Sequence, residues 1–168
     1  TISRIMEIFQ AFPDLIFAMA IMTFLGKGVL NLFIALGLLT WVRTARMIRG
    51  SVMQLKEKEY IEASRACGAS TYWIIMKGLV PNCLSTIIVL VTLGIPNAIM
   101  YEASLSFLGI GIQPPTPSWG NMISAAQTFI SYRPVYSIMP GVAIMITVIA
   151  FNIFGDGLRD ALDPKLKN

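Results

Sequence analysis

Two long intervals of this 168-residue chain contain no charged residue, and each is long enough to cross a lipid bilayer. They run from Gly78 to Tyr101, which is 24 residues, and from Pro134 to Gly155, which is 22 residues. A helix needs roughly 20 apolar residues to cross about 30 Å of hydrocarbon. With 55% hydrophobic residues and 13% charged residues, the chain is also too apolar for an ordinary soluble domain. The pattern predicts an all-α integral membrane protein.

Two shorter uncharged intervals predict further spans. The interval from Gly28 to Val42 is extended by Arg43 and Arg46, whose long side chains reach toward the headgroups. The interval from Leu15 to Gly26 follows Pro13 and Asp14, which favour a helix start, although its length also permits a re-entrant segment. We therefore predict four spans, near residues 11–26, 28–48, 80–101 and 134–155.

The basic residues orient these spans, because cytoplasmic loops retain Lys and Arg. With a cytoplasmic N-terminal end, four crossings place 11 of the 13 basic residues inside and leave Lys27 and Arg133 outside. The C-terminal end is then cytoplasmic as well. We find no internal repeat or linker, so residues 1–168 are expected to form one domain. Thr1 is not an initiator Met and no signal peptide follows it, so we expect a piece of a longer chain.

A polar segment, residues 51–79, separates the second and third predicted spans. Its strong helix formers and the possible pairs of Glu62 with Lys58 and with Arg65 predict a short helix. Gly68 suits the left-handed position that ends a helix, and Ser70 or Thr71 suits the start of the next one. The segment is predicted to form helix, glycine turn, helix.

The run from Glu62 to Pro81, EASRACGASTYWIIMKGLVP, resembles the EAA signature of permease subunits in binding-protein-dependent ABC transporters. Ser64, Gly78 and Val80 depart from the common pattern. Residues 103–122 and 154–166 more narrowly resemble the second permease of dipeptide and oligopeptide importers. In that family the complete subunit has two further spans on the N-terminal side.

The resemblance implies a MetI-like transmembrane domain, in a prokaryotic plasma or inner membrane, that carries peptides. Nickel or another small solute is the alternative cargo. The implied partners are a second permease subunit, two ATP-binding subunits, an extracytoplasmic solute-binding protein and the lipid bilayer. Coupling to the ATPase is implied for six positions of the signature: Glu62, Ala63, Ser64, Ala66, Gly68 and Pro81.

The interval from Glu102 to Arg133 is rich in Gly and Pro, which break helices, so we expect an ordered outer loop whose first part, residues 105–112, folds back on the helices. The candidates for an outer gate or a binding-protein contact are Glu102, Pro114, Pro115 and Trp119. A purely structural loop and an interfacial Glu102 remain alternatives. Gly94 and Pro96 form a candidate hinge in the third span.

Several function classes fit poorly. The chain has no His and no phosphate-binding GxxxxGK[ST] loop, so it is not the ATPase, and an intramembrane hydrolase lacks a base. An ion-coupled carrier needs ionisable groups at mid-membrane, which we do not expect in these spans. Basic residues flank the membrane rather than forming a nucleic-acid surface. We predict no cofactor. We also predict no metal site, because Arg159 lies among Asp156, Asp160 and Asp163 at spacings that favour ion pairs.

Overall fold

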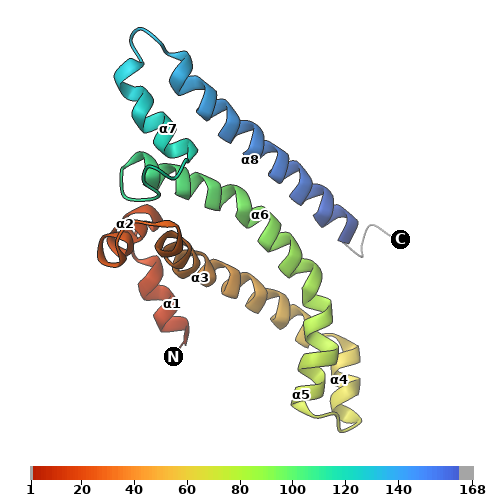
Figure 1. Cartoon of the computed structure of the whole chain (residues 1–168). Coiled ribbons are helices and arrows are strands. Elements are labelled where there is room, and N and C mark those ends of the chain that lie inside the picture. The colour runs from red at the N-terminus through yellow and green to blue at the C-terminus, as the bar shows by residue number, and fades with distance from the viewer. Residues whose placement is uncertain (1, 163–168) are drawn as a thin grey trace.

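The computed structural model describes residues 2–162, except for the side chains of residues 2, 3, 5 and 8, and this part of the chain is helical without a β-strand (Figure 1). In chain order the elements are α1 (Ile2–Gln10), α2 (Asp14–Leu25), α3 (Val29–Lys56), α4 (Glu59–Ala66), α5 (Thr71–Trp73), a π-helix η1 (Ile74–Leu79), α6 (Val80–Phe107), α7 (Trp119–Ala126), a 3-10 turn η2 (Gln127–Phe129) and α8 (Val135–Leu162).

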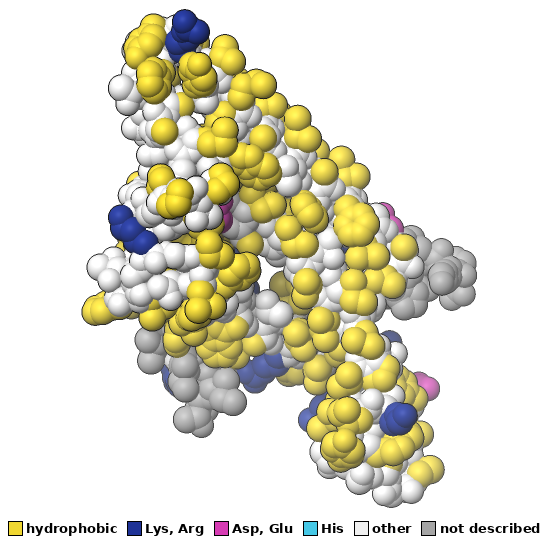
Figure 2. All heavy atoms as spheres, in the orientation of Figure 1, with side chains coloured by type: hydrophobic (Ala, Val, Ile, Leu, Met, Phe, Trp, Pro, Cys, Tyr) yellow, Lys and Arg dark blue, Asp and Glu magenta, His cyan; other side chains and the backbone are white. Residues whose placement is uncertain are grey.

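Three helical segments are long and apolar enough to cross a membrane: α3, the joined α5–η1–α6 segment, and α8. They overlap the predicted ranges 28–48, 80–101 and 134–155, but each continues beyond its range. A helix of 28 residues is about 42 Å long, which exceeds the hydrocarbon thickness. The charged residues that limit the predicted ranges therefore do not end the helices. Figure 2 shows apolar side chains spread over the length of these helices.

The first predicted span, residues 11–26, differs from the structure. Residues 11–13 are not helical, because Pro13 has an extended ψ of 131° and separates α1 from α2. The 12 residues of α2 extend only about 18 Å, which is shorter than the other three segments and than the hydrocarbon thickness. The Phe9 and Phe17 rings make an edge-to-face contact 5.3 Å apart across the break.

A small core holds α2, α3 and the end of α6 together. It contains Ala18 and Met22 of α2, Leu32 and Ala35 of α3, and Leu105 of α6. The two alanines, Ala18 of α2 and Ala35 of α3, are small enough to let the helix backbones approach each other, as is usual inside membranes. The tight α2–α3 connection is fixed by a side-chain amide, since Asn31 donates to the carbonyls of Leu25 at 2.7 Å and Gly26 at 3.1 Å.

A close crossing joins α6 to α8. A β-carbon on Gly155 would lie 2.6 Å from the Leu93 Cδ2 atom and 3.5 Å from the Thr92 Cγ2 atom. Gly155 is buried, so the absence of a side chain allows α8 to lie directly against α6. Figure 1 shows α8 running beside α6.

The expected outer loop contains more helix than predicted. α6 continues to Phe107, and the two-turn helix α7 forms at Trp119 despite Gly120, because the Ser118 hydroxyl accepts from the Asn121 N–H at 3.2 Å and caps the helix. The predicted return of residues 105–112 is confirmed. Ile110 and Ile112 pack against the core, and the N–H groups of Ile110 and Gly111 both donate to the Leu105 carbonyl.

Candidate functional site

The predicted helix, glycine turn, helix is present at α4 and α5. Gly68 has a φ of 78°, the left-handed conformation that favours glycine. The Ser70 hydroxyl accepts from the Trp73 N–H at 3.2 Å and caps α5, so Ser70 is the capping residue and Thr71 is the first helical residue. These local predictions are confirmed. We call residues 59–73 the tip, because they form the far end of the α3–α6 pair in Figure 1.

The predicted ion pairs of α4 are not formed. Neither Lys58 nor Arg65 is bonded to Glu62 in the structure, since these side chains are exposed and gain little from pairing in water. Instead the Ser64 hydroxyl donates to the Tyr60 carbonyl at 2.7 Å. The charges of α4 therefore remain available to solvent or to another protein.

α4 is joined to the next helix through Ile61 and Gly78. Ile61 is only 1% exposed, and a β-carbon on Gly78 would lie 2.8 Å from its Cδ1 atom. The Gly78 carbonyl accepts from the Asn82 amide at 2.7 Å and from the Tyr60 hydroxyl at 3.4 Å. Gly78, a departure from the family pattern, is thus the position that lets α4 lie against η1.

The second helix of the tip is not separate from the membrane. α5, η1 and α6 form one helical segment of 37 residues, Thr71–Phe107, with the π-helix just before Pro81. Pro81 has no N–H to donate within the helix, and π-helical turns occur often at functional sites. Residues 71–73 of the tip are therefore continuous with α6.

Most of the predicted coupling residues are accessible. Glu62, Ala63, Ala66, Gly68 and Pro81 are exposed, and Ser64 is half-buried. Sequence reasoning missed two aromatic residues beside them, since Tyr72 is 73% exposed and Trp73 is 50% exposed. Large exposed aromatic side chains are typical of protein contact sites. Only the fold shows that both aromatic residues are exposed at the tip.

The candidate gate residues fall into two groups. Glu102 and Trp119 line one cavity of about 280 Å³ beside the start of α3. The Glu102 carboxylate accepts from the Ser106 hydroxyl at 2.7 Å, and Ser106 in turn accepts from the Ile112 N–H at 3.0 Å. Pro114 and Pro115 are joined by a cis peptide bond and are exposed, and they do not line that cavity.

The candidate hinge residues lie within an unbroken α6. Pro96 is buried, and a β-carbon on Gly94 would meet no atom within 4 Å. Since Pro96 cannot donate to the Thr92 carbonyl, one bond of the helix is missing there. Thr92 is itself buried against α8 through Gly155.

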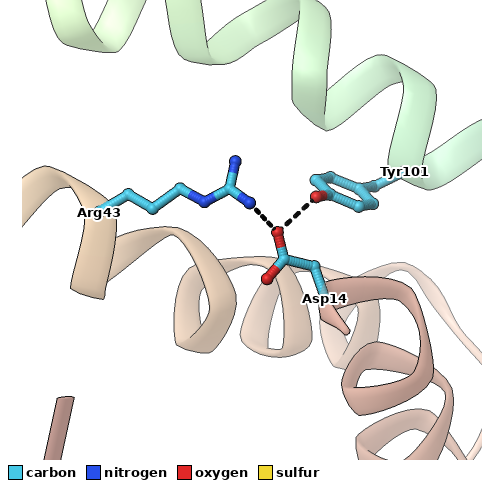
Figure 3. Close-up of polar contacts among 3 residues, drawn as sticks. All are labelled: Asp14, Arg43 and Tyr101. Atoms are coloured by element: carbon cyan, nitrogen blue, oxygen red, sulfur yellow. Dashed lines mark hydrogen bonds and ion pairs between the residues drawn. The ribbon is translucent and has the colours of Figure 1, made fainter. Parts of the chain in front are cut away.

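A polar cluster that joins three helices was not predicted. Asp14 at the start of α2 forms an ion pair with Arg43 of α3, and the Tyr101 hydroxyl of α6 donates to the same carboxylate oxygen at 2.8 Å (Figure 3). The sequence reading assigned Asp14 to a helix dipole and Arg43 to the membrane surface. Asp14 does lie in the first turn of α2, as predicted, and the structure adds contacts that the sequence did not indicate, because three residues from three helices meet at one oxygen atom.

Within the described residues, Asp156 and Asp160 near the end of α8 do not form the predicted ion pairs with Arg159. Arg159 is bonded neither to Asp156 nor to Asp160 in the structure, and all three are exposed, so solvent satisfies these charges. Asp163 lies outside the described residues. Within residues 2–162, no group of His, Cys, Asp and Glu has the arrangement of a metal site.

Comparison with known proteins identifies the family. Residues 1–168 match the family described as "Binding-protein-dependent transport system inner membrane component". The chain is 43% identical over 166 residues to "Glutathione transport system permease protein GsiD" of Shigella flexneri serotype 5b, and equally to the proteins of that name from Escherichia coli O157:H7 and Shigella sonnei. Each alignment covers 99% of this chain and 55% of the relative, so the chain spans about half the length of these relatives. The family match over the whole sequence and the close relatives agree with the resemblance drawn from the EAA signature, and this chain belongs to the family of inner membrane components of binding-protein-dependent transport systems.

Proposed function

We propose that this chain is a permease domain of an ATP-driven importer of short peptides, and that its tip receives motion from separate ATP-binding subunits. One observation carries the proposal: α5, the second helix of the tip, and the helix α6 belong to one helical segment of 37 residues. From Thr71 to Tyr101 such a segment extends about 45 Å. A displacement of the tip is therefore transmitted along this segment to the polar cluster and to the outer loop.

The tip has the surface that such a contact needs. Glu62 offers a charge to a basic partner, Ala63 and Ala66 permit close approach, and Gly68 fixes the turn between α4 and α5. Tyr72 and Trp73 add an exposed apolar anchor. The Ser64 hydroxyl bonds the Tyr60 carbonyl within α4, and the exposed Pro81 follows η1, where the helix leads from the tip into α6.

We assign four crossings to the domain, with both ends of the chain and the tip in the cytoplasm. The first crossing consists of α1 and α2 in series, since α2 alone is too short. Phe9 supports this arrangement, because it contacts Phe17 of α2 and Trp41 of α3 across the break at Pro13. The remaining crossings are α3, α6 and α8.

The opposite end of the domain faces the solute-binding protein. Glu102 and Trp119, which border the cavity near the start of α3, form the proposed outer gate, and Pro114 and Pro115 present an exposed turn to the binding protein. The missing helix bond at Pro96, next to Gly94, lets α6 flex between the tip and this gate. A second permease subunit completes the pathway.

The peptide assignment follows the relatives, which are named for glutathione transport, and glutathione is a tripeptide. Nickel as the cargo has less support, because residues 2–162 offer no group of metal-ligating side chains. ATP hydrolysis belongs to the partner subunits, so this chain contributes motion and a pathway.

Cysteine cross-linking tests the coupling role. Ala66→Cys, and the native exposed Cys67, are expected to cross-link to an ATP-binding subunit in membranes that contain the complete transporter. Met122→Cys in α7, made in a chain whose Cys67 is replaced by Ser, is the matched control: Met122 is exposed and lies at the other end of the domain, so this variant is expected to give no such product. Cross-linking at Met122→Cys but not at positions 66 and 67 would contradict the proposal.

A further inference from the structure

The polar cluster borders a cavity of about 300 Å³ between α2, α3 and α6. Asp14, Arg43 and Tyr101 lie on its wall with three uncharged polar residues, Thr40, Thr44 and Asn97. This volume lies at the small end of the range found for binding pockets of small molecules. The sequence suggested no binding site here, since the six residues are spread over three helices.

The depth of the cluster argues that the cavity contains water or solute. Arg43 lies 14 residues after Val29, the first residue of α3, and therefore about 21 Å along that helix. This distance is less than the roughly 30 Å of hydrocarbon in a typical bilayer. Charged side chains at such a depth face the interior of a helix assembly or a water-filled cavity, because exposure to lipid is too costly.

Arg43 retains the capacity to bind an anion. Its side chain is 63% exposed, whereas that of Asp14 is 28% exposed, and one terminal nitrogen of Arg43 donates to Asp14. The other N–H groups of the planar guanidinium are free to bind a carboxylate in a two-pronged fashion. The Tyr101 hydroxyl of α6 donates to Asp14, and Asp14 in turn forms the ion pair with Arg43. Asp14 therefore acts as the positioning residue for Arg43.

The cavity also continues along α6. A second cavity of about 340 Å³ shares Met47, Leu90 and Leu93 with the first and reaches Arg159 near the end of α8. The two cavities are therefore neighbours along the side of α6, and we call them together the trough, which extends from the polar cluster toward the end of the domain that carries the tip. A solute in this trough passes Arg43 first and Arg159 later.

We propose that Arg43 is a binding residue for the terminal carboxylate of a short peptide that passes along this trough. The inference rests on the proposed import of peptides and adds a specific contact within the membrane. Asp14 and Tyr101 hold the guanidinium in place. The Thr40 and Thr44 hydroxyls donate to carbonyls of their own helix, so each can still accept a hydrogen bond from a peptide N–H, and the Asn97 amide keeps its oxygen and one N–H for the peptide backbone.

Direct binding to the membrane complex tests this contact. The complete transporter, without its solute-binding protein, is placed in nanodiscs of zwitterionic lipid, which supply no anionic headgroup to occupy Arg43. Binding of radiolabelled glutathione is compared with binding of its C-terminal amide, which lacks the glycine carboxylate. We expect the wild type to prefer glutathione by about tenfold or more, the usual effect of one charge-assisted hydrogen bond.

Arg43→Gln is expected to remove this preference, and Arg43→Lys, which keeps the charge, to retain part of it. Arg46→Gln is the matched control, because Arg46 is an exposed arginine of α3 that does not line the cavity, and it is expected to keep the full preference. The preference is a ratio measured on one protein sample, so a loss of folded protein does not change it.

Two results would overturn the contact: an unchanged preference in Arg43→Gln, or no binding and no preference in the wild type. ATP-driven uptake of glutathione with the binding protein present is measured in parallel. If the wild type takes up glutathione and either of these two binding results is found, the Arg43 contact is rejected but the proposed cargo is not. Absence of uptake in the wild type rejects the proposed cargo.

Discussion

Gly120 of α7 lies directly against the backbone of Ala103 in α6: a β-carbon at residue 120 would be 2.2 Å from the Ala103 carbonyl oxygen and 2.9 Å from its Cα atom. Backbone atoms cannot move aside as the end of a side chain can. The contact therefore fixes α7, and the outer loop that leads into it, on the end of α6. The loop is also bonded to the end of α6 through Ser106, whose hydroxyl donates to the Glu102 carboxylate and accepts from the Ile112 N–H.

Gly120→Ala is expected to push α7 away from α6 and to destabilise the domain by about 1 to 3 kcal/mol, the usual cost of overpacking. Thermal unfolding of the purified complex measures the loss. Gly141→Ala in α8 is the control, because a β-carbon there would meet no atom within 4 Å. Equal melting temperatures for the two variants would contradict the close contact.

Gly68→Ala tests the turn of the tip. A β-carbon there has free space, so the change acts only through the left-handed backbone, which costs an ordinary residue about 1 to 2 kcal/mol. We expect less uptake for each ATP hydrolysed. Gly68→Asn should impair transport less, since Asn tolerates this conformation better. If Asn is as harmful as Ala, the backbone conformation is not the cause.

Ile61→Ala is expected to loosen α4 from η1, because it removes a buried side chain that contacts Gly78. Such truncations cost about 2 to 5 kcal/mol. Hydrogen exchange of the amides of residues 59–66 should accelerate, while exchange in α8 should not change. Ile75→Ala, at a 42% exposed position of η1, is the control and should leave exchange in α4 unaltered.

Tyr101→Phe removes only the hydroxyl that donates to Asp14 at 2.8 Å. The loss of a hydrogen bond to a charged group should lower stability by about 1 to 3 kcal/mol. Thermal unfolding measures it, and Tyr132→Phe, at a 65% exposed position, serves as the control. A Tyr101→Phe variant as stable as the wild type would show that this bond adds nothing to the joining of α2 and α6.

The long helices and the turn at Gly68 were predictable because their signals are local. An uncharged interval of more than 20 residues, or a glycine followed by a Ser cap, needs no knowledge of the rest of the chain. The ends of the helices were less predictable, since α3 continues past Arg43, Arg46 and Arg49 to Lys56. Charge limits how much of a helix lies in lipid, whereas helix propensity decides where the helix ends.

The polar cluster was not predictable, because Asp14 is separated from Arg43 by 29 positions and from Tyr101 by 87. Each residue alone has an ordinary local explanation. The close approaches at Gly78 and Gly120 have the same origin, since a sequence does not show which glycine faces another helix. The candidate hinge at Gly94 and Pro96 lies where predicted, within α6, and its movement remains a prediction.

The side of the membrane on which the tip lies is the central claim, and the native cysteines provide its most direct test. Cys67 is exposed at the tip and Cys83 is buried in α6, so a membrane-impermeant maleimide should label this chain at Cys67. The chain is expressed without the ATP-binding subunits, which would cover the tip. We predict labelling in inside-out vesicles and none in intact spheroplasts. Labelling of Cys67 in intact spheroplasts would place the tip outside and contradict the account.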